Sequence, residues 1–295
     1  MTKASGCLFG LAYGDALGRP TEFLTVAEIQ DRYGLEGPRD LDGDPALVTD
    51  DTQMTLAVAW ALLDAAVPTP EVLEPLLRAR FLAWAASPDN NRAPGMTCLH
   101  ACAELGRGVP WQQATVTGSK GCGANMRVAP VGLIAGYGED ILAGVAQLQA
   151  GLTHGHPTAL AAGELTAHAV RVLREGAALH DLPGLLHARC RSQRSVYRHE
   201  WLGALWQQPG IFDPREYISR GWDECAQALD RLDLALTLPD DGDDACSITG
   251  AGWVAEEALA GAFLGAHHGM AAWPPSWQHR IEYADQLRAL ATAWD

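Results

Sequence analysis

The sequence carries few of the signals that predict β-strands. Strict alternation of apolar and polar residues is rare, Asn-Gly turns are absent, and runs of β-branched residues are short. Strands are recognised from such patterns, separated by turn residues. Their scarcity predicts an all-α fold.

Positive charge is also in short supply. The 21 lysines and arginines are outnumbered by 36 acidic residues, which gives a formal net charge of −15. An acidic surface argues against non-specific binding to nucleic acid or to an anionic membrane. A small anionic ligand would therefore need local help from a metal ion, a helix N-terminus or a few well-placed bases.

Targeting and cross-linking signals are missing as well. No apolar run reaches the ~18 residues of a membrane span, and residues 1–6 do not begin a secretory signal. The seven cysteines are an odd number, are scattered and include no C-x-x-C pair. This favours reduced thiols over disulfides or a zinc site, so we expect a soluble, cytoplasmic protein without a membrane partner.

Length and composition are those of a globular protein with a sizeable core. The chain has 295 residues, of which 48% are hydrophobic and 19% are charged. No linker divides it, so we expect a single domain over residues 1–295. Helical segments are predicted at residues 53–66, 70–86, 96–105, 139–150, 158–174 and 279–293.

The stretch from Val48 to Leu56 predicts a loop that enters a buried helix. Thr49, Asp50 and Asp51 lie at its start, and the next turns are almost entirely apolar. Aspartates at this position can simply cap the helix and interact with its dipole. One cap is enough, however, and a second carboxylate in apolar surroundings needs a cation or a partner. We therefore interpret these residues as oxygen ligands of a hard divalent ion.

The N-terminal segment predicts a helix that packs closely against a neighbour. Its glycines recur at a spacing of four, at Gly6, Gly10, Gly14 and Gly18. Residues at this spacing share one helix face, where another backbone can approach. Asp15, on the same segment, either bonds a nearby helix end or acts behind a metal or ligand, and we include it among the candidate substrate-binding residues. Glu22 is either a surface cap or a residue that faces a cleft.

The segment from Gly118 to Arg127 is the most polar of the glycine-bearing stretches. Its glycines would permit positive φ and let backbone N–H groups converge on an anion. A plain loop with two solvated bases is the alternative. We favour a phosphate or nucleotide site, with these residues as candidates: Ser119, Lys120, Gly121, Cys122, Gly123 and Arg127.

Two histidines, His154 and His156, precede the helix predicted at 158–174. Ligation of a metal is one interpretation, but no further His or Cys lies at a supporting spacing. Hydrogen bonds to an anionic ligand, aided by the helix dipole, suit them better.

Taken together, these motifs resemble the ADP-ribosylglycohydrolase family, which includes the dinitrogenase reductase-activating glycohydrolases. The similarity extends from the N-terminus to about residue 260 and is specific in combination. It is carried by GCLFGLAYGDALGRPTEF, TDDTQMTLAVAWALL, SPDNNRAPGMTCL, SKGCGANMRVAPVGL, THGHPTALAAGELTA and TGAGWVAEEALA.

The resemblance implies a compact, single-domain all-α bundle that holds two Mg²⁺ ions and hydrolyses the N-glycosidic bond between ADP-ribose and a modified side chain, commonly arginine. Thr49, Asp50 and Asp51 match the first group of metal ligands. Glu22 borders the substrate site and is a candidate catalytic residue with Asp50 and Asp51, the 119–123 loop holds the diphosphate, and the two histidines line the ligand. Asp50 or Asp51 would orient the attacking water.

The chain departs from the family pattern after residue 258. The family has a further helix and a G-D-x-D-S/T loop with the second group of metal ligands, but here Leu259 and Ala260 run directly into GAFLGAHHG. About thirty residues are expected to be missing, judged from a usual helix-loop-helix span. One Mg²⁺ ion, or none, is then the expectation in place of two.

Three hypotheses follow from this departure. The first is an active, Mg²⁺-dependent hydrolase of an ADP-ribosylated protein, and the second is a catalytically weak or inactive protein that binds ADP-ribose. The third is an open, partly unfolded scaffold. A monomer is expected for the first two.

Overall fold

The computed structural model describes the backbone of residues 3–237 and 253–295, and the side chains of residues 3–231 and 258–295. Within these ranges the protein is helical, and two isolated β-bridges are the only extended pairings. The all-α prediction is confirmed. None of the described helices is long and apolar enough to cross a membrane.

The first half of the chain supplies eight helices. They are α1 (Lys3–Gly18), α2 (Val26–Tyr33), α3 (Asp50–Asp64), α4 (Pro70–Ala85), α5 (Met96–Gly106), α6 (Trp111–Ala114), α7 (Ala129–Leu133) and α8 (Glu139–Gly151). Two 3₁₀ turns are inserted, η1 (Arg19–Thr21) and η2 (Cys122–Ala124).

The second half continues in the same way. Its α-helices are α9 (Pro157–Glu175), α10 (Leu182–Gln193), α11 (His199–Leu202), α12 (Pro214–Thr237), α13 (Trp253–His268), α14 (Trp277–Arg280) and α15 (Ala284–Trp294). The 3₁₀ turns here are η3 (Leu179–Asp181) and η5 (Gly269–Ala272). All six helical segments predicted from the sequence are present, although the last begins five residues later than predicted and follows the short α14.

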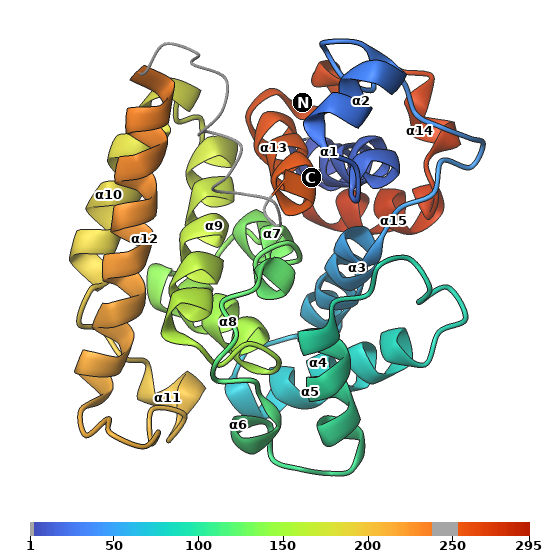
Figure 1. Ribbon diagram of the computed structural model, residues 1–295. Helices are drawn as coiled ribbons and strands as arrows, with labels where there is room; N and C mark the ends of the chain where they lie inside the picture. Colours follow the sequence, from blue (N-terminus) through green and yellow to red (C-terminus); the bar gives the residue numbers. More distant parts are fainter. Residues whose placement is uncertain (1–2, 238–252) are drawn as a thin grey trace.

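Two hydrophobic clusters form the core. The first lies among α4, α5, α8 and α12, and the second lies among α1, α13 and α15. Figure 1 shows α10 and α12 at one side of the molecule and α1 with α13 at the other, with α7 and α9 between them.

Helix α3 is apolar nearly all round because it serves both clusters. Met54 and Val58 belong to the first cluster, and Leu56 and Ala59 belong to the second. A helix placed between two cores has no face left for solvent. This sharing supports a single domain over residues 1–295, which stays a prediction.

The glycine stripe of α1 lies against α13, as expected. A Cβ atom on Gly10 would come within 2.3 Å of the Gly261 carbonyl oxygen, and one on Gly261 would come within 2.0 Å of the Gly10 oxygen. Gly6 and Gly265 meet in the same way. Only residues without a Cβ allow the two backbones to approach so closely.

Substituting Gly10 with Ala should therefore lower the free energy of unfolding by about 1–3 kcal/mol, the usual cost of overpacking. Gly184→Ala on α10 is the matched control, because a Cβ there meets nothing within 4 Å. Chemical denaturation of both variants measures the difference. Equal stabilities would contradict the close contact between α1 and α13.

Candidate active site

The N-terminus of α3 is held by a carboxylate from α1. Asp15 is fully buried and accepts hydrogen bonds from both backbone and side chain of Thr49 and Thr52. The Thr49 N–H lies 3.0 Å from each oxygen, and the two hydroxyls lie at 2.7 and 2.5 Å. Burial raises the pKa of Asp15, and these hydrogen bonds oppose the rise.

Of the two roles left open for Asp15, the bond to a helix end is the one that the structure shows. Both of its oxygens are engaged by the first turn of α3. A side chain so placed does not contact a substrate directly, so its expected substrate-binding role is corrected. It fixes the helix that carries Asp50 and Asp51.

Asp50 and Asp51 are 6% and 5% exposed and stand in the first turn of α3. Asp50 Oδ2 accepts a hydrogen bond from the Gly95 N–H at 3.1 Å, and burial raises the pKa of Asp50 to about 7. Asp51 Oδ2 is buried without a hydrogen-bond partner. Burial, followed by the charges of Asp15 and Asp50, raises the pKa of Asp51 well above its usual value.

A cation would satisfy the unpartnered Asp51 oxygen and relieve the repulsion between these carboxylates. Among the described side chains, however, no three His, Cys, Asp or Glu residues come together as a metal site. Helix α13 passes through residues 259–261 without an intervening loop, as the sequence indicates. Of the side chains that the structure describes, Thr49, Asp50 and Asp51 therefore offer oxygen donors for at most one cation, which would keep most of its waters.

Glu22 lies just beyond η1 and is half-buried. Burial and, next, the charge of Asp15 raise its pKa. Glu22 also contributes to the raised pKa values of Asp50 and Asp51, which places it near them. Its neighbour Phe23 is 82% exposed at the same edge.

The glycine loop of residues 118–123 rests on His154. A Cβ on Gly123 would lie 3.0 Å from both Cys98 Sγ and His154 Cε1, and one on Gly121 would lie 3.5 Å from His154 Nε2. None of the loop glycines has positive φ, so the left-handed conformation that glycine permits is not used there. A glycine is needed at residue 123 because a Cβ atom there would crowd Cys98 and His154.

The same loop is tied to the start of α5. Ser119 Oγ lies 3.1 Å from Thr97 Oγ1 and accepts a hydrogen bond from the Gly121 N–H. Gly95, two residues before Thr97, is the donor to Asp50. The Asp50 and Asp51 charges also help raise the pKa of Cys122 to about 11, after the larger effect of burial. The glycine loop and the carboxylates therefore border one region.

Arg127 lies behind this loop and does not face solvent. It is fully buried, stacks over the Phe81 ring and donates to the Gln149 side chain, the Gln149 carbonyl and Thr153 Oγ1. Its expected contact with a phosphate is corrected for this reason. The hydrogen bonds hold the chain between α8 and His154, because Thr153 Oγ1 in turn lies 2.8 Å from His154 Nδ1.

The two histidines differ in their surroundings. His154 is 2% exposed, and burial together with the Arg127 charge lowers its pKa to about 3, so it is neutral at physiological pH. His156 is half-buried and caps α9, since its Nδ1 accepts from the Thr158 N–H at 3.1 Å. Burial and, next, the Lys120 charge lower its pKa.

Lys120 is held by a residue that the sequence does not single out. Its Nζ donates to both oxygens of Glu224 on α12, at 2.8 and 2.7 Å. Glu224 Oε2 also accepts from Thr158 Oγ1 at 2.7 Å. The pair is separated by 104 residues, so no local pattern could reveal it.

Comparison with known proteins identifies the family. The family model for ADP-ribosylglycohydrolases matches residues 1–294. The chain belongs to the ADP-ribosylglycohydrolase family. The family that the sequence motifs indicate is thereby confirmed.

Three relatives illustrate the range of similarity. The ADP-ribosyl-[dinitrogen reductase] glycohydrolase of Rhodospirillum rubrum is 32% identical over 212 residues, which cover 67% of this chain and 64% of that protein. The ADP-ribosylarginine hydrolase Tri1 of Pseudomonas putida is 24% identical, covering 99% of this chain and 77% of its own. A solved ADP-ribosylglycohydrolase-related protein complex superposes with a TM-score of 0.61 at 25% identity, covering 99% of this chain and 96% of that one.

The matches to the first curated relatives are partial. They span 54% and 64% of the lengths of two of those proteins. The family and the fold are shared, whereas activity and substrate are matters for proposal.

The raised pKa of Asp50 predicts how stability depends on pH. In the folded protein the carboxyl keeps its proton up to about pH 7, but in the unfolded chain it loses the proton near 3.8. Between these values the folded state binds more protons, so the free energy of unfolding falls as pH rises, by up to about 2–4 kcal/mol.

Asp50→Asn removes this pH-dependent contribution to the free energy of unfolding and keeps an acceptor for the Gly95 N–H. Without divalent cations, the melting temperature of wild type should drop relative to the variant between pH 5 and pH 8, by roughly 5 °C. Thermal melts in EDTA across this range measure it. A constant difference between the two proteins would contradict the assigned pKa.

Proposed function

We propose that this protein hydrolyses the N-glycosidic bond that links ADP-ribose to a modified side chain, most simply arginine, with Mg²⁺ as cofactor. The observation that carries the proposal is the buried Asp51 oxygen without a partner, beside Asp50 and in the region that the glycine loop also borders. The name of the Rhodospirillum rubrum glycohydrolase supports the reaction, and the name of the ADP-ribosylarginine hydrolase Tri1 supports arginine.

The chain's own groups have distinct roles in this proposal. Thr49, Asp50 and Asp51 would hold the cation, which lowers the pKa of a bound water and offsets negative charge when present. Asp50 or Asp51 orients water toward the anomeric carbon, and Glu22 borders the same space. The 119–123 loop borders the space proposed for the diphosphate, where the Gly121 N–H would exchange its bond to Ser119 Oγ for one to the ligand, and Lys120 can add a charge.

The cleavage itself breaks the bond between the anomeric carbon and the guanidine nitrogen. The water oxygen bonds to the anomeric carbon, one water proton passes to a carboxylate, and the leaving nitrogen is protonated as arginine is released. The products are free ADP-ribose and an unmodified arginine. We further propose that the protein is a cytoplasmic monomer. Its partner is an ADP-ribosylated protein or free ADP-ribose.

A second candidate function is supported by the uninterrupted α13. If the second group of metal ligands is absent, the same site could bind ADP-ribose without efficient turnover. Residues 238–252 and the side chains through residue 257 lie outside the described residues, and the TGAGWVAEE part of the family motif falls there. The alternative therefore rests on α13 and on the donor set at α3.

The first test is hydrolysis of an arginine-ADP-ribosylated protein in the presence of Mg²⁺. Asp51→Asn should reduce ADP-ribose release by at least about 100-fold, since it removes a cation ligand and a charge. Asp31→Asn on the exposed face of α2 is the control and should leave release unchanged. Stabilisation by ADP-ribose in EDTA, with no release under any condition, would instead identify the binding protein.

A second prediction concerns Lys120, whose charge is shared between Glu224 and any bound diphosphate. Glu224→Gln frees the lysine and should tighten ADP-ribose binding by about 2–5-fold, the value of an exposed ion pair. Asp223→Asn is the matched control. Asp223 lies on α12 like Glu224, and its ion pair with Arg194 is about as exposed as the pair of Glu224 with Lys120. Calorimetry at low salt compares the three proteins, and weaker binding by the Gln variant would show that Glu224 orients Lys120 and does not compete for it.

A further inference from the structure

Two described residues other than glycine have a left-handed backbone, Ala93 with φ of 51° and Tyr283 with φ of 59°. This conformation costs a residue with a Cβ atom about 1 kcal/mol or more, and it persists where the surroundings impose it. Ala93 directly follows Arg92, and Tyr283 directly follows Glu282. Arg92 and Glu282 are themselves ion-paired across 190 residues of sequence.

The Arg92–Glu282 pair is shielded from water. The side chains are 16% and 14% exposed, and both guanidinium Nη atoms bond to the carboxylate, with Nη2 at 2.9 Å from Oε1. Two parallel, charge-assisted hydrogen bonds fix orientation as well as distance. Such a pair constrains the segments that carry it far more than an exposed one does.

Both members of the pair also hold the backbone of Val48. The Val48 N–H donates to Glu282 Oε2 at 3.1 Å, and Arg92 Nη1 donates to the Val48 carbonyl at 2.7 Å. Val48 immediately precedes Thr49, the N-cap of α3. The chain therefore enters α3, which carries Asp50 and Asp51, from a residue whose N–H and carbonyl are both held by hydrogen bonds.

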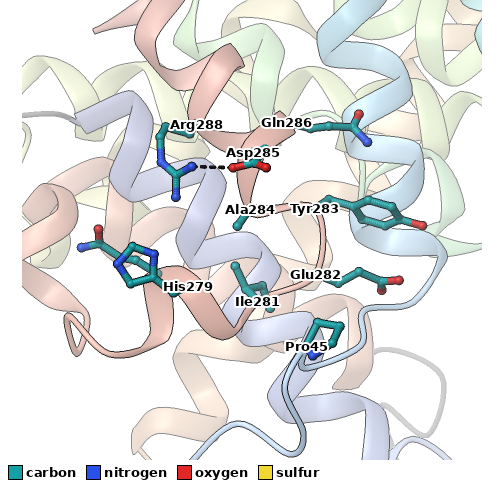
Figure 2. Close-up of a pocket in the computed structure, with 10 residues that line it drawn as sticks. Pro45, His279, Ile281, Glu282, Tyr283, Ala284, Asp285, Gln286 and Arg288 are labelled. Carbon is teal, nitrogen blue, oxygen red and sulfur yellow. Dashed lines mark hydrogen bonds and ion pairs between the residues drawn. The ribbon is translucent and has the colours of Figure 1, made fainter.

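The C-terminal segment supports this contact along its length. The Ala46 N–H donates to the Arg280 carbonyl, and the Glu282 N–H donates to the Ala46 carbonyl at 3.0 Å. Figure 2 shows Glu282 of this segment close to Pro45 in the loop before α3, with Tyr283 beside Glu282. The Tyr283 hydroxyl lies 3.2 Å from Asp89 Oδ2, so the loop before Arg92 is held as well.

On its other side, the pair reaches Asp50 through a short loop. Gly95 follows Arg92 by three residues, and its N–H donates to Asp50 Oδ2 at 3.1 Å. Two segments meet at Asp50. The chain that enters α3 is held at Val48, and the segment that ends at Gly95 is held at Arg92. The strained Ala93 lies between Arg92 and Gly95, where the chain must turn to present that N–H.

We propose that Arg92 and Glu282 are positioning residues, which set the geometry of Asp50 and Asp51 without touching the substrate. The kinetic part of this inference rests on the proposed hydrolase function. Its structural part does not, because local order around Asp50 can be measured in a protein without turnover.

The test compares Glu282→Gln with Glu74→Gln. Glu74 forms a similarly shielded pair with Arg78, which also donates to two backbone carbonyls, so the control removes the same chemistry from a place away from α3. Hydrogen exchange is measured in both variants at the amides of residues 48–52 and at Gly95. ADP-ribose release from the arginine-modified substrate gives kcat and KM.

We expect exchange to quicken by about 10-fold or more at these amides in Glu282→Gln, and to stay at the wild-type rate in Glu74→Gln. We also expect kcat to fall by about 10–100-fold with KM within about 3-fold, because misplacement of reacting groups acts on the chemical step. A merely structural role would lower the stability of both variants and leave kcat alone.

Three results would overturn the inference: unchanged exchange at residues 48–52, an unchanged kcat in an active enzyme, or equal effects in the two variants. If wild type releases no ADP-ribose, the hydrolase proposal fails, and the exchange result alone decides for or against the positioning role. If Glu282→Gln does not fold, Arg92→Lys replaces it, because lysine keeps the charge and loses the bidentate geometry.

Discussion

The candidate site depends on one buried carboxylate. Asp15 sits at the positive end of α3 and accepts hydrogen bonds from the Thr49 and Thr52 N–H groups and hydroxyls. A buried charge is tolerated only when such donors surround it. Because Asp15 comes from α1, and the glycines of α1 bring it against α13, the packing of the second core determines where α3 begins.

This anchoring has an electrostatic cost. Asp15 takes the Thr49 and Thr52 N–H groups and the Asp51 N–H donates to Thr49 Oγ1, so these donors do not serve the Asp50 and Asp51 carboxylates, which are also buried. Their pKa values rise, Glu22 adds to the repulsion, and one Asp51 oxygen stays unsatisfied. Proteins tend to accumulate such unfavourable arrangements where a ligand will complete them.

Local patterns in the sequence predicted the elements well. The glycine spacing in α1, the acidic start of α3 and most helix limits depend on neighbouring residues, so they can be read from the chain. The failures concern contacts made across the fold. Arg127 looks like a loop base but lies behind the loop, and Glu224, Arg92 and Glu282 meet their partners only through tertiary packing.

The glycine loop carries a consequence for how a ligand would be received. It is held from beneath by His154, at one end by Ser119 against Thr97, and at its surface by Lys120 against Glu224. A loop that is already ordered loses little conformational entropy when an anion binds, so more of the contact energy is kept as affinity. Recognition there would follow a preformed shape, and selectivity would come from the fit to fixed N–H groups.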